Sequence, residues 1–182
     1  MKATIITFVL AAMLALPGQA QRYLTKNGNI SFFSETPIEN IEAHNKQVNA
    51  ALDITSGKMV FKVLMKSFEF EKALMQEHFN ENYVESDKYP SATFDGLIKE
   101  IDVFGKEKPE TMEVSIEGKL TIHGVTREIS EKGSLQWKED GIKGDARFMV
   151  APADYDIKIP NAVMNNIAKE IEVVVDVDLK QF

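Results

Sequence analysis

The sequence predicts a mainly β protein, an antiparallel barrel of about eight strands with one or two short helices. Apolar and polar residues alternate in one segment after another, turn signals separate the segments, and only residues 71–83 show the spacing of an amphipathic helix. A barrel is favoured over an open sheet because the last alternating segment, residues 171–180, can pair with the first segment and so remove both sheet edges.

The clearest strand prediction covers residues 112–122. Every even-numbered position in this range is apolar or glycine, and the odd-numbered positions are polar. A glycine inside a strand usually marks a bulge or a sharp bend, so we expect bulges at Gly118 and, in the strand predicted over residues 125–137, at Gly133. Gly124 ends the strand.

The remaining elements follow from the same two periodicities. Asn27-Gly28 is the strongest hairpin signal in the chain and predicts a turn within residues 22–53, which should hold two or three strands. Residues 71–83 predict an amphipathic helix of about three turns. Further strands are expected at residues 58–66, 92–102, 142–150 and 171–180, with a polar connection at 105–110 and a short helix at 162–169.

Residues 1–20 have the pattern of a secretory signal peptide. Lys2 precedes an apolar run that ends at Leu16, and the small residue Ala20 suits cleavage directly after it. The run is shorter than the about 20 apolar residues of a membrane-spanning helix. We therefore expect residues 21–182 to form one periplasmic or secreted domain without a transmembrane segment. The chain has no cysteine, so the domain must be stable without disulfides.

Composition and motifs argue against several classes of function. The net charge of −7 disfavours a nucleic-acid partner, because such binding depends on basic contacts to phosphate. His44, His78 and His123 are the only histidines, and no metal-binding, nucleophile-elbow, P-loop or dinucleotide motif occurs. We expect no metal, no cofactor, no catalytic residue and no enzyme. An isomerase or hydrolase would become the better hypothesis only if His78 or His123 faced a cavity beside a carboxylate.

Three sequence motifs resemble those of a known family. They are Leu120-Thr121-Ile122-His123-Gly124-Val125-Thr126, Tyr89-Pro90-Ser91-Ala92-Thr93-Phe94-Asp95-Gly96, and Phe68-Glu69-Phe70 with His78-Phe79 downstream. The first is similar to the L-T-I-H-G-V-T core of the YceI-like family. The resemblance implies a lipocalin-like periplasmic barrel that binds a polyisoprenoid or a related long apolar lipid.

Strand parity and the predicted helix face suggest which side chains line the barrel interior. This set is rich in Phe and Met, which suits either an ordinary packed core or an adaptable apolar tunnel; the resemblance favours the tunnel. His123, at a strand end, is either a structural hydrogen-bonding residue or a contact to a lipid head group. The predicted lining is Phe32, Met59, Phe61, Val63, Met65, Phe68, Met75, Phe79, Phe94, Ile98, Met112, Val114, Ile122 and Phe148.

The leading hypothesis is a binding protein that holds a polyisoprenoid, an isoprenoid quinone or a prenyl phosphate in the barrel for carriage, storage or stress protection. The alternative is a non-catalytic envelope interaction module whose barrel is filled by side chains. An exposed apolar patch and the absence of a cavity would favour the alternative. The sequence leaves the oligomeric state open, a homodimer included.

Overall fold

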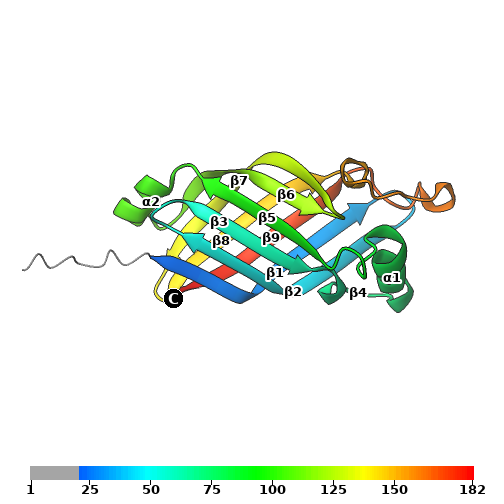
Figure 1. The fold of residues 1–182 in the computed structure, drawn as a ribbon, viewed down its shortest axis with the longest axis horizontal. Coiled ribbons are helices and arrows are strands. Elements are labelled where there is room, and N and C mark those ends of the chain that lie inside the picture. The colour runs from blue at the N-terminus through cyan, green and yellow to red at the C-terminus, as the bar shows by residue number, and fades with distance from the viewer. Residues whose placement is uncertain (1–20) are drawn as a thin grey trace, which may run out of the picture.

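The structure, a computed structural model, describes residues 21–182, so the predicted signal peptide lies outside the described residues. Eight long strands form a closed antiparallel barrel in the order β1-β9-β8-β7-β6-β5-β3-β2, and β2 pairs again with β1 (Figure 1). The predicted pairing of the last strand with the first is confirmed. The strands are β1 (Arg22–Glu35), β2 (Asn40–Asp53), β3 (Lys58–Leu64), β5 (Ser91–Ile98), β6 (Met112–Ile122), β7 (Val125–Lys138), β8 (Gly141–Val150) and β9 (Ile171–Gln181), and β4 (Glu69–Phe70) is a two-residue addition to β2.

The first hairpin differs from the prediction. Asn27-Gly28 is not a turn: it lies inside β1, where the register against β2 shifts on both sides of Gly28. Glycine is needed there because a Cβ atom would lie 2.7 Å from Cγ1 of Val177 on β9. The turn comes later, at Thr36-Pro37-Ile38-Glu39, where the Thr36 hydroxyl accepts a hydrogen bond of 3.0 Å from the Glu39 amide.

The bulges predicted at Gly118 and Gly133 are wrong. The pairing of β6 with β5 and β7 runs through both positions without a register shift. Gly118 pairs with Gly96 of β5, and the ring of Phe94 lies over both: a Cβ atom on Gly118 would be 2.8 Å from the ring carbon Cζ and 2.5 Å from the Gly96 Cα. These glycines make room for an aromatic ring and for the neighbouring strand.

Short helical segments close the two ends of the barrel. The predicted helix at 71–83 is α1 (Ala73–His78), continued by the π-helical turn η2 (Phe79–Tyr83). The strand predicted to reach residue 102 instead ends at Ile98, and Ile101–Glu107 form the helix α2, because Ile101 and Phe104 are buried together by helical spacing. The other segments are the single turns η1 (Met65–Ser67), η3 (Pro152–Tyr155) and η4 (Asn161–Val163), the last much shorter than the helix predicted at 162–169.

The helices of the described residues are all too short or too polar to cross a membrane. Their role in the fold is to cover the barrel ends. Figure 1 shows α2 and the C-terminus at one end of the long axis, and α1 at the opposite end, where η4 also lies.

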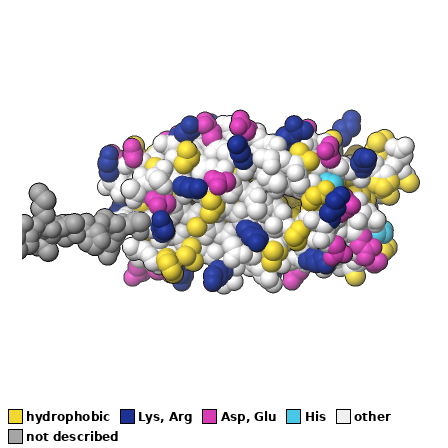
Figure 2. Space-filling view, viewed as in Figure 1, with side chains coloured by type: hydrophobic (Ala, Val, Ile, Leu, Met, Phe, Trp, Pro, Cys, Tyr) yellow, Lys and Arg dark blue, Asp and Glu magenta, His cyan; other side chains and the backbone are white. Residues whose placement is uncertain are grey.

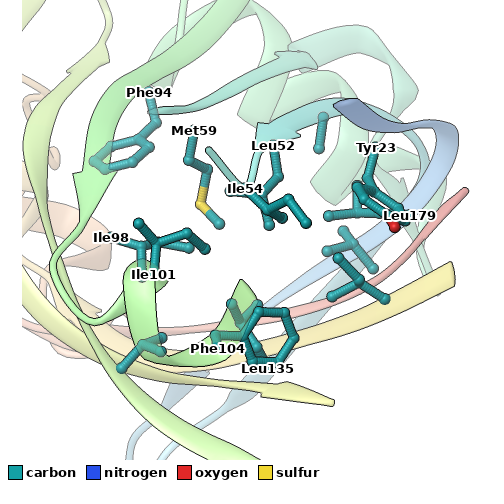
Figure 3. Packing of buried hydrophobic residues seen from close by; sticks show 14 of the residues in the cluster. Tyr23, Leu52, Ile54, Met59, Phe94, Ile98, Ile101, Phe104, Leu135 and Leu179 are labelled. Atoms are coloured by element: carbon teal, nitrogen blue, oxygen red, sulfur yellow. The ribbon is translucent and has the colours of Figure 1, made fainter. Parts of the chain in front are cut away.

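The barrel interior holds two clusters of buried side chains at different heights along the barrel axis. The larger cluster, which we call the packed half, surrounds Phe104 and includes Leu52, Leu135, Ile142 and Leu179, each 1% exposed or less (Figure 3). The smaller cluster lies toward α1 and includes Ile30, Val63, Met65, Phe68 and Val84. We call this second part the open half, for the reason that follows.

Candidate functional site

The open half encloses a cavity of about 480 Å³. Inward-facing side chains from β1, β2, β3, β5, β6, β8 and β9 form its wall, and α1, η2 and the segment around η4 cover it. Nearly all the lining side chains are apolar. The cavity reaches the surface at Leu74 of α1, whose side chain is 61% exposed. A concave apolar site of this size suits a small molecule or part of a chain.

Part of the predicted lining lies around this cavity. The residues come from four strands and from the segment between β3 and β5, and strand parity or helix spacing identified each of them. They are Phe32, Val63, Met65, Phe68, Met75, Phe79, Ile122 and Phe148.

The rest of the predicted lining does not reach the cavity. Met59, Phe94, Ile98 and Val114 are buried in the packed half, and Phe61 and Met112 pack against it. They face inward, as their parity predicts, but they lie on the segments of their strands that belong to the packed half. Residues four positions apart on one strand, such as Met59 and Val63, therefore belong to different halves.

An aromatic cluster joins the covering segments to the barrel wall. The ring of Phe32 on β1 lies 5.3 Å from that of Phe68, 5.7 Å from Phe70 and 5.5 Å from Phe79, measured between centroids. Phe70 and Phe79 are themselves 5.1 Å apart. Aromatic pairs at such distances add to the free energy of burial, so this cluster fixes α1 and η2 over the cavity.

Three of the polar lining residues, Glu39, Lys72 and Asn166, lie together at the opening, which we call the mouth and define by these residues. Glu39 lies in the β1–β2 turn; its two carboxylate oxygens accept hydrogen bonds from Asn166 Nδ2 at 3.2 Å and from Lys72 Nζ at 3.3 Å. The bonds from Asn166 and Lys72 lower the pKa of Glu39. A further bond, from the Ala168 amide to the buried Ser34 hydroxyl at 2.9 Å, ties the same segment to β1. Three segments far apart in sequence thus meet at one carboxylate.

Sequence reasoning missed the mouth and much of the wall. Glu39 and Asn166 lie in segments without periodicity, and Lys72 reads as an ordinary solvated charge. Ile157 and Ile159 lie in a connection predicted to be irregular, which it is apart from η3. For Ile30, Ala92, Leu120 and Val173 a signal existed, because each has the inward parity of its strand.

His123 does not line the cavity. It and Gly124 have positive φ angles, +51° and +78°, and form the tight turn between β6 and β7. The imidazole Nδ1 contacts the Tyr155 carbonyl oxygen at 3.1 Å and Nε2 contacts a Glu85 carboxylate oxygen at 2.8 Å, while the Tyr89 ring lies 4.5 Å away. Both ring nitrogens are therefore occupied by protein groups. The side chain links three loops and makes no contact with the cavity.

Two of the three motifs that carry the family resemblance pack against each other through His123, Gly124 and Tyr89. A Cβ atom on Gly124 would lie 2.5 Å from Cε1 of Tyr89, the first residue of the second motif. Glycine is thus required both for the positive φ angle and for the closeness of the tyrosine ring. These motifs hold the loops at one end of the barrel together.

His78, at the end of α1, does line the cavity. Within residues 21–182, however, no hydrogen bond or ion pair joins it to a carboxylate. The arrangement that would favour an isomerase or hydrolase, a histidine paired with a carboxylate inside the cavity, is therefore not formed by the described side chains. The chemistry available at the site is that of an apolar surface with a few polar groups at its opening.

Comparisons with known proteins agree with the fold. A family model described as the YceI-like domain matches residues 23–179. The structure of a polyisoprenoid-binding domain from Saccharophagus degradans, implicated in plant cell wall breakdown, superposes with a TM-score of 0.77 at 16% identity, covering 90% of this chain and 100% of that one.

Two further solved structures are similar. Burkholderia cenocepacia BcnA gives a TM-score of 0.69 at 16% identity and covers 84% of this chain and 94% of its own. A Campylobacter jejuni YceI protein gives 0.63 at 18% identity, with 81% and 88% covered. The comparison with curated proteins finds no match.

Proposed function

Because the chain belongs to the YceI-like domain family, we propose that it is an exported binding protein that holds a long apolar lipid in the cavity of the open half. The lipid would be a polyisoprenoid, an isoprenoid quinone or a prenyl phosphate. Its role would be carriage, storage or protection under stress in the periplasm or outside the cell. The proposal includes no catalytic step.

The observation that carries the proposal is the cavity itself, about 480 Å³ lined almost entirely by apolar side chains. Moving ten methylene groups from water into such a site contributes roughly 8 kcal/mol at about 0.8 kcal/mol each, before the costs of association. No charged anchor is required for binding at that level. The similar Saccharophagus degradans domain, described as polyisoprenoid-binding, supports the ligand class.

The alternative, an interaction module with a filled barrel, is disfavoured by the same cavity. Its supporting observation is a set of exposed apolar side chains around the mouth: Ile38 is 63% exposed, Leu74 61% and Met164 55%. Figure 2 shows hydrophobic side chains gathered at this end of the molecule. Such a rim suits a lipid-binding protein equally well, because a chain must pass it on entry.

The test is native mass spectrometry of the protein purified from its own cell envelope, followed by organic extraction and identification of any lipid. We expect a long-chain isoprenoid species in near-stoichiometric amount. The variant Ala92→Phe, which places a ring in the cavity, should lose it. The control is Leu64→Phe, which adds a ring on the outer face of the neighbouring strand. A folded wild-type protein that carries no lipid and takes up none of the three lipid classes would refute the proposal and favour the interaction module.

A further inference from the structure

The barrel wall is only partly paired between β7 and β8. From the turn that joins them, the two strands pair as far as Gly133 and Ala146. Beyond this point β7 continues to Val125 in its long hairpin with β6 (Figure 1), and the end of β8 pairs with β9 alone. A groove lined by Glu128 and Met149, among others, lies between the diverging strands. One edge of β7 therefore has no strand of the described chain beside it over residues 125–132.

A similar divergence elsewhere in the barrel is filled by the chain itself. β2 and β3 also separate, but β4 pairs with Ala43 and His44 of β2, and the Asn45 side chain donates a hydrogen bond of 2.9 Å to the Leu64 carbonyl. Along β7, η3 lies only at the beginning of the free stretch, where it accepts a hydrogen bond of 2.8 Å from Arg127 Nε. The rest of the edge is available to a strand from outside.

The free backbone groups of β7 can be assigned from the hairpin geometry. Lys138 and Gly141 flank the two-residue turn between β7 and β8, so they exchange backbone hydrogen bonds. In an antiparallel ladder every second residue of a strand bonds to the same neighbour. The series therefore continues along the even-numbered residues of β7 to Lys132, Ser130 and Glu128, whose N–H and C=O groups point into the groove. An unpaired edge of this kind is a template for another strand.

The side chains along this edge are complementary to themselves. Glu128, Ser130 and Lys132 lie on the outer face of β7, and all three are exposed. Glu128 and Lys132 stand two residues to either side of Ser130 and carry opposite charges. When two copies of the strand pair in antiparallel orientation about Ser130, each Glu128 lies opposite the partner's Lys132. A register shifted by four residues would place like charges opposite each other, which is unfavourable.

We propose that two copies of the chain associate through this edge, with residues 128–132 of each β7 paired in antiparallel orientation about a two-fold axis at Ser130. The contact is isologous, because the same surface of both subunits forms it. The opposed residues are the even-numbered ones, so each opposed pair can exchange backbone hydrogen bonds. Glu128, Ser130 and Lys132 do not line the cavity, so the association is independent of the proposed lipid binding.

The size of the contact sets its strength. Met149 of β8, which lines the groove and is 49% exposed, gives the incoming strand an apolar contact. A pairing of this length still buries less than the roughly 800 Å² per partner of a typical stable interface. We therefore expect a weak and reversible dimer, in which the opposite charges select the register and the backbone hydrogen bonds hold the strands together.

The first experiment is sedimentation equilibrium of the protein at concentrations up to about 1 mM, where weak association is populated. Lys132→Glu and Glu128→Lys should each weaken the dimer by about tenfold, because each places like charges opposite each other twice. The double variant with both exchanges should return to within about threefold of the wild type. The control is Lys62→Glu, which changes an exposed lysine on β3, a strand paired on both sides there, and should have no effect.

The second experiment reads the register from single cysteines, since the chain has none of its own. Ser130→Cys places both thiols at the two-fold axis and should give a disulfide-linked dimer under mild oxidation. Thr126→Cys lies on the same edge, but its two Cα atoms would be about 27 Å apart at about 3.4 Å per residue, so it should form no such dimer.

Two results would overturn the proposal. A protein that stays monomeric at the highest concentration would show that the edge does not pair with itself, which would leave it as a site for an extended peptide of another protein. A dimer that neither responds to the charge exchange nor crosslinks through Ser130→Cys would form through a different surface.

Discussion

The two halves of the barrel should respond differently when the same side chain is shortened in each. Val173 and Val177 lie on one face of β9, four residues apart, the first lining the cavity and the second 1% exposed in the packed half. Val173→Ala and Val177→Ala are therefore chemically identical changes at two heights of one strand. Any difference in the free energy of unfolding reports the packing around them.

The magnitude for Val177→Ala follows from its neighbours. Its two γ-methyl groups point at glycines on both adjacent strands: Cγ1 lies 2.7 Å from an ideal Cβ position on Gly28, and Cγ2 lies 3.3 Å from that on Gly144. Losing two methyl groups forfeits roughly 1.6 kcal/mol at about 0.8 kcal/mol per carbon. Glycines have no side chain with which to fill the void, so an unrelaxed cavity of about 40 Å³ adds roughly 1 kcal/mol.

We therefore expect Val177→Ala to lower the free energy of unfolding by about 2.5 kcal/mol and Val173→Ala by about 1 kcal/mol or less, because the Val173 methyl groups already face open space. Urea unfolding of lipid-free protein, followed by the fluorescence of the single tryptophan, Trp137, measures both values. Equal losses in the two variants would refute the division of the barrel into an open and a packed half.

Three further changes test other features of the fold. Gly118→Ala should lower the free energy of unfolding by about 2 kcal/mol or more, because the new Cβ would lie 2.5 Å from backbone atoms. Gly105→Ala in α2, where only one atom lies near the new Cβ, at 3.5 Å, should instead raise the free energy of unfolding by about 0.5–1 kcal/mol. Thermal denaturation compares the two variants, and equal effects would contradict the steric argument. Asn45→Ala should lower the free energy of unfolding by about 2 kcal/mol, because the fully buried side-chain amide of Asn45 donates to the Leu64 carbonyl at 2.9 Å and accepts from the Gln47 amide at 2.9 Å. An unchanged urea midpoint would show that these two hydrogen bonds do not stabilise the fold. The hydrogen bond from His123, with the charge of Lys88, lowers the pKa of Glu85 below its ordinary value of 4.5. The ionised Glu85 carboxylate therefore contributes stability above pH 4.5, and this contribution is lost as the pH falls through the lowered pKa. Glu85→Gln should reduce the melting temperature above pH 4.5 and match the wild type in stronger acid, and a constant difference across that range would contradict this.

The strands could be predicted from the sequence because their signal is local. The alternation over residues 112–122 identifies β6 and its inward face without reference to any other strand. The glycines were harder, because a glycine in a strand marks either a bulge or a close contact. The neighbour across the sheet decides between them: Gly118 faces Gly96 and the Phe94 ring, whereas the register shifts at Gly28, where a turn was predicted.

The helix α2 was missed because its signal is short. Only Ile101 and Phe104 are buried in its seven residues, and only two residues separate Ile101 from the strand that ends at Ile98. Two apolar residues do not distinguish a helical period from the end of a strand.

The inward orientation of the side chains was predictable, but the position of the cavity along the barrel was not. Parity shows that Met59 and Val63 both face inward, yet only a three-dimensional structure shows at which height α2 fills the barrel and at which height the interior stays open. The mouth could not be predicted from the sequence for a different reason. Glu39, Lys72 and Asn166 meet through hydrogen bonds between segments that share no local pattern.

The two ends of the described chain are neighbours at the packed end of the barrel. The Phe182 amide donates to the Arg22 carbonyl at 2.9 Å, and the Ile54 amide donates to the Gln21 carbonyl at 3.2 Å, at the end of the barrel opposite α1 (Figure 1). A surface tether or fusion partner attached at Phe182 would therefore leave the molecule on the side away from the mouth. A sensor chip carrying the protein by this end would expose every cavity to the passing solution in the same orientation.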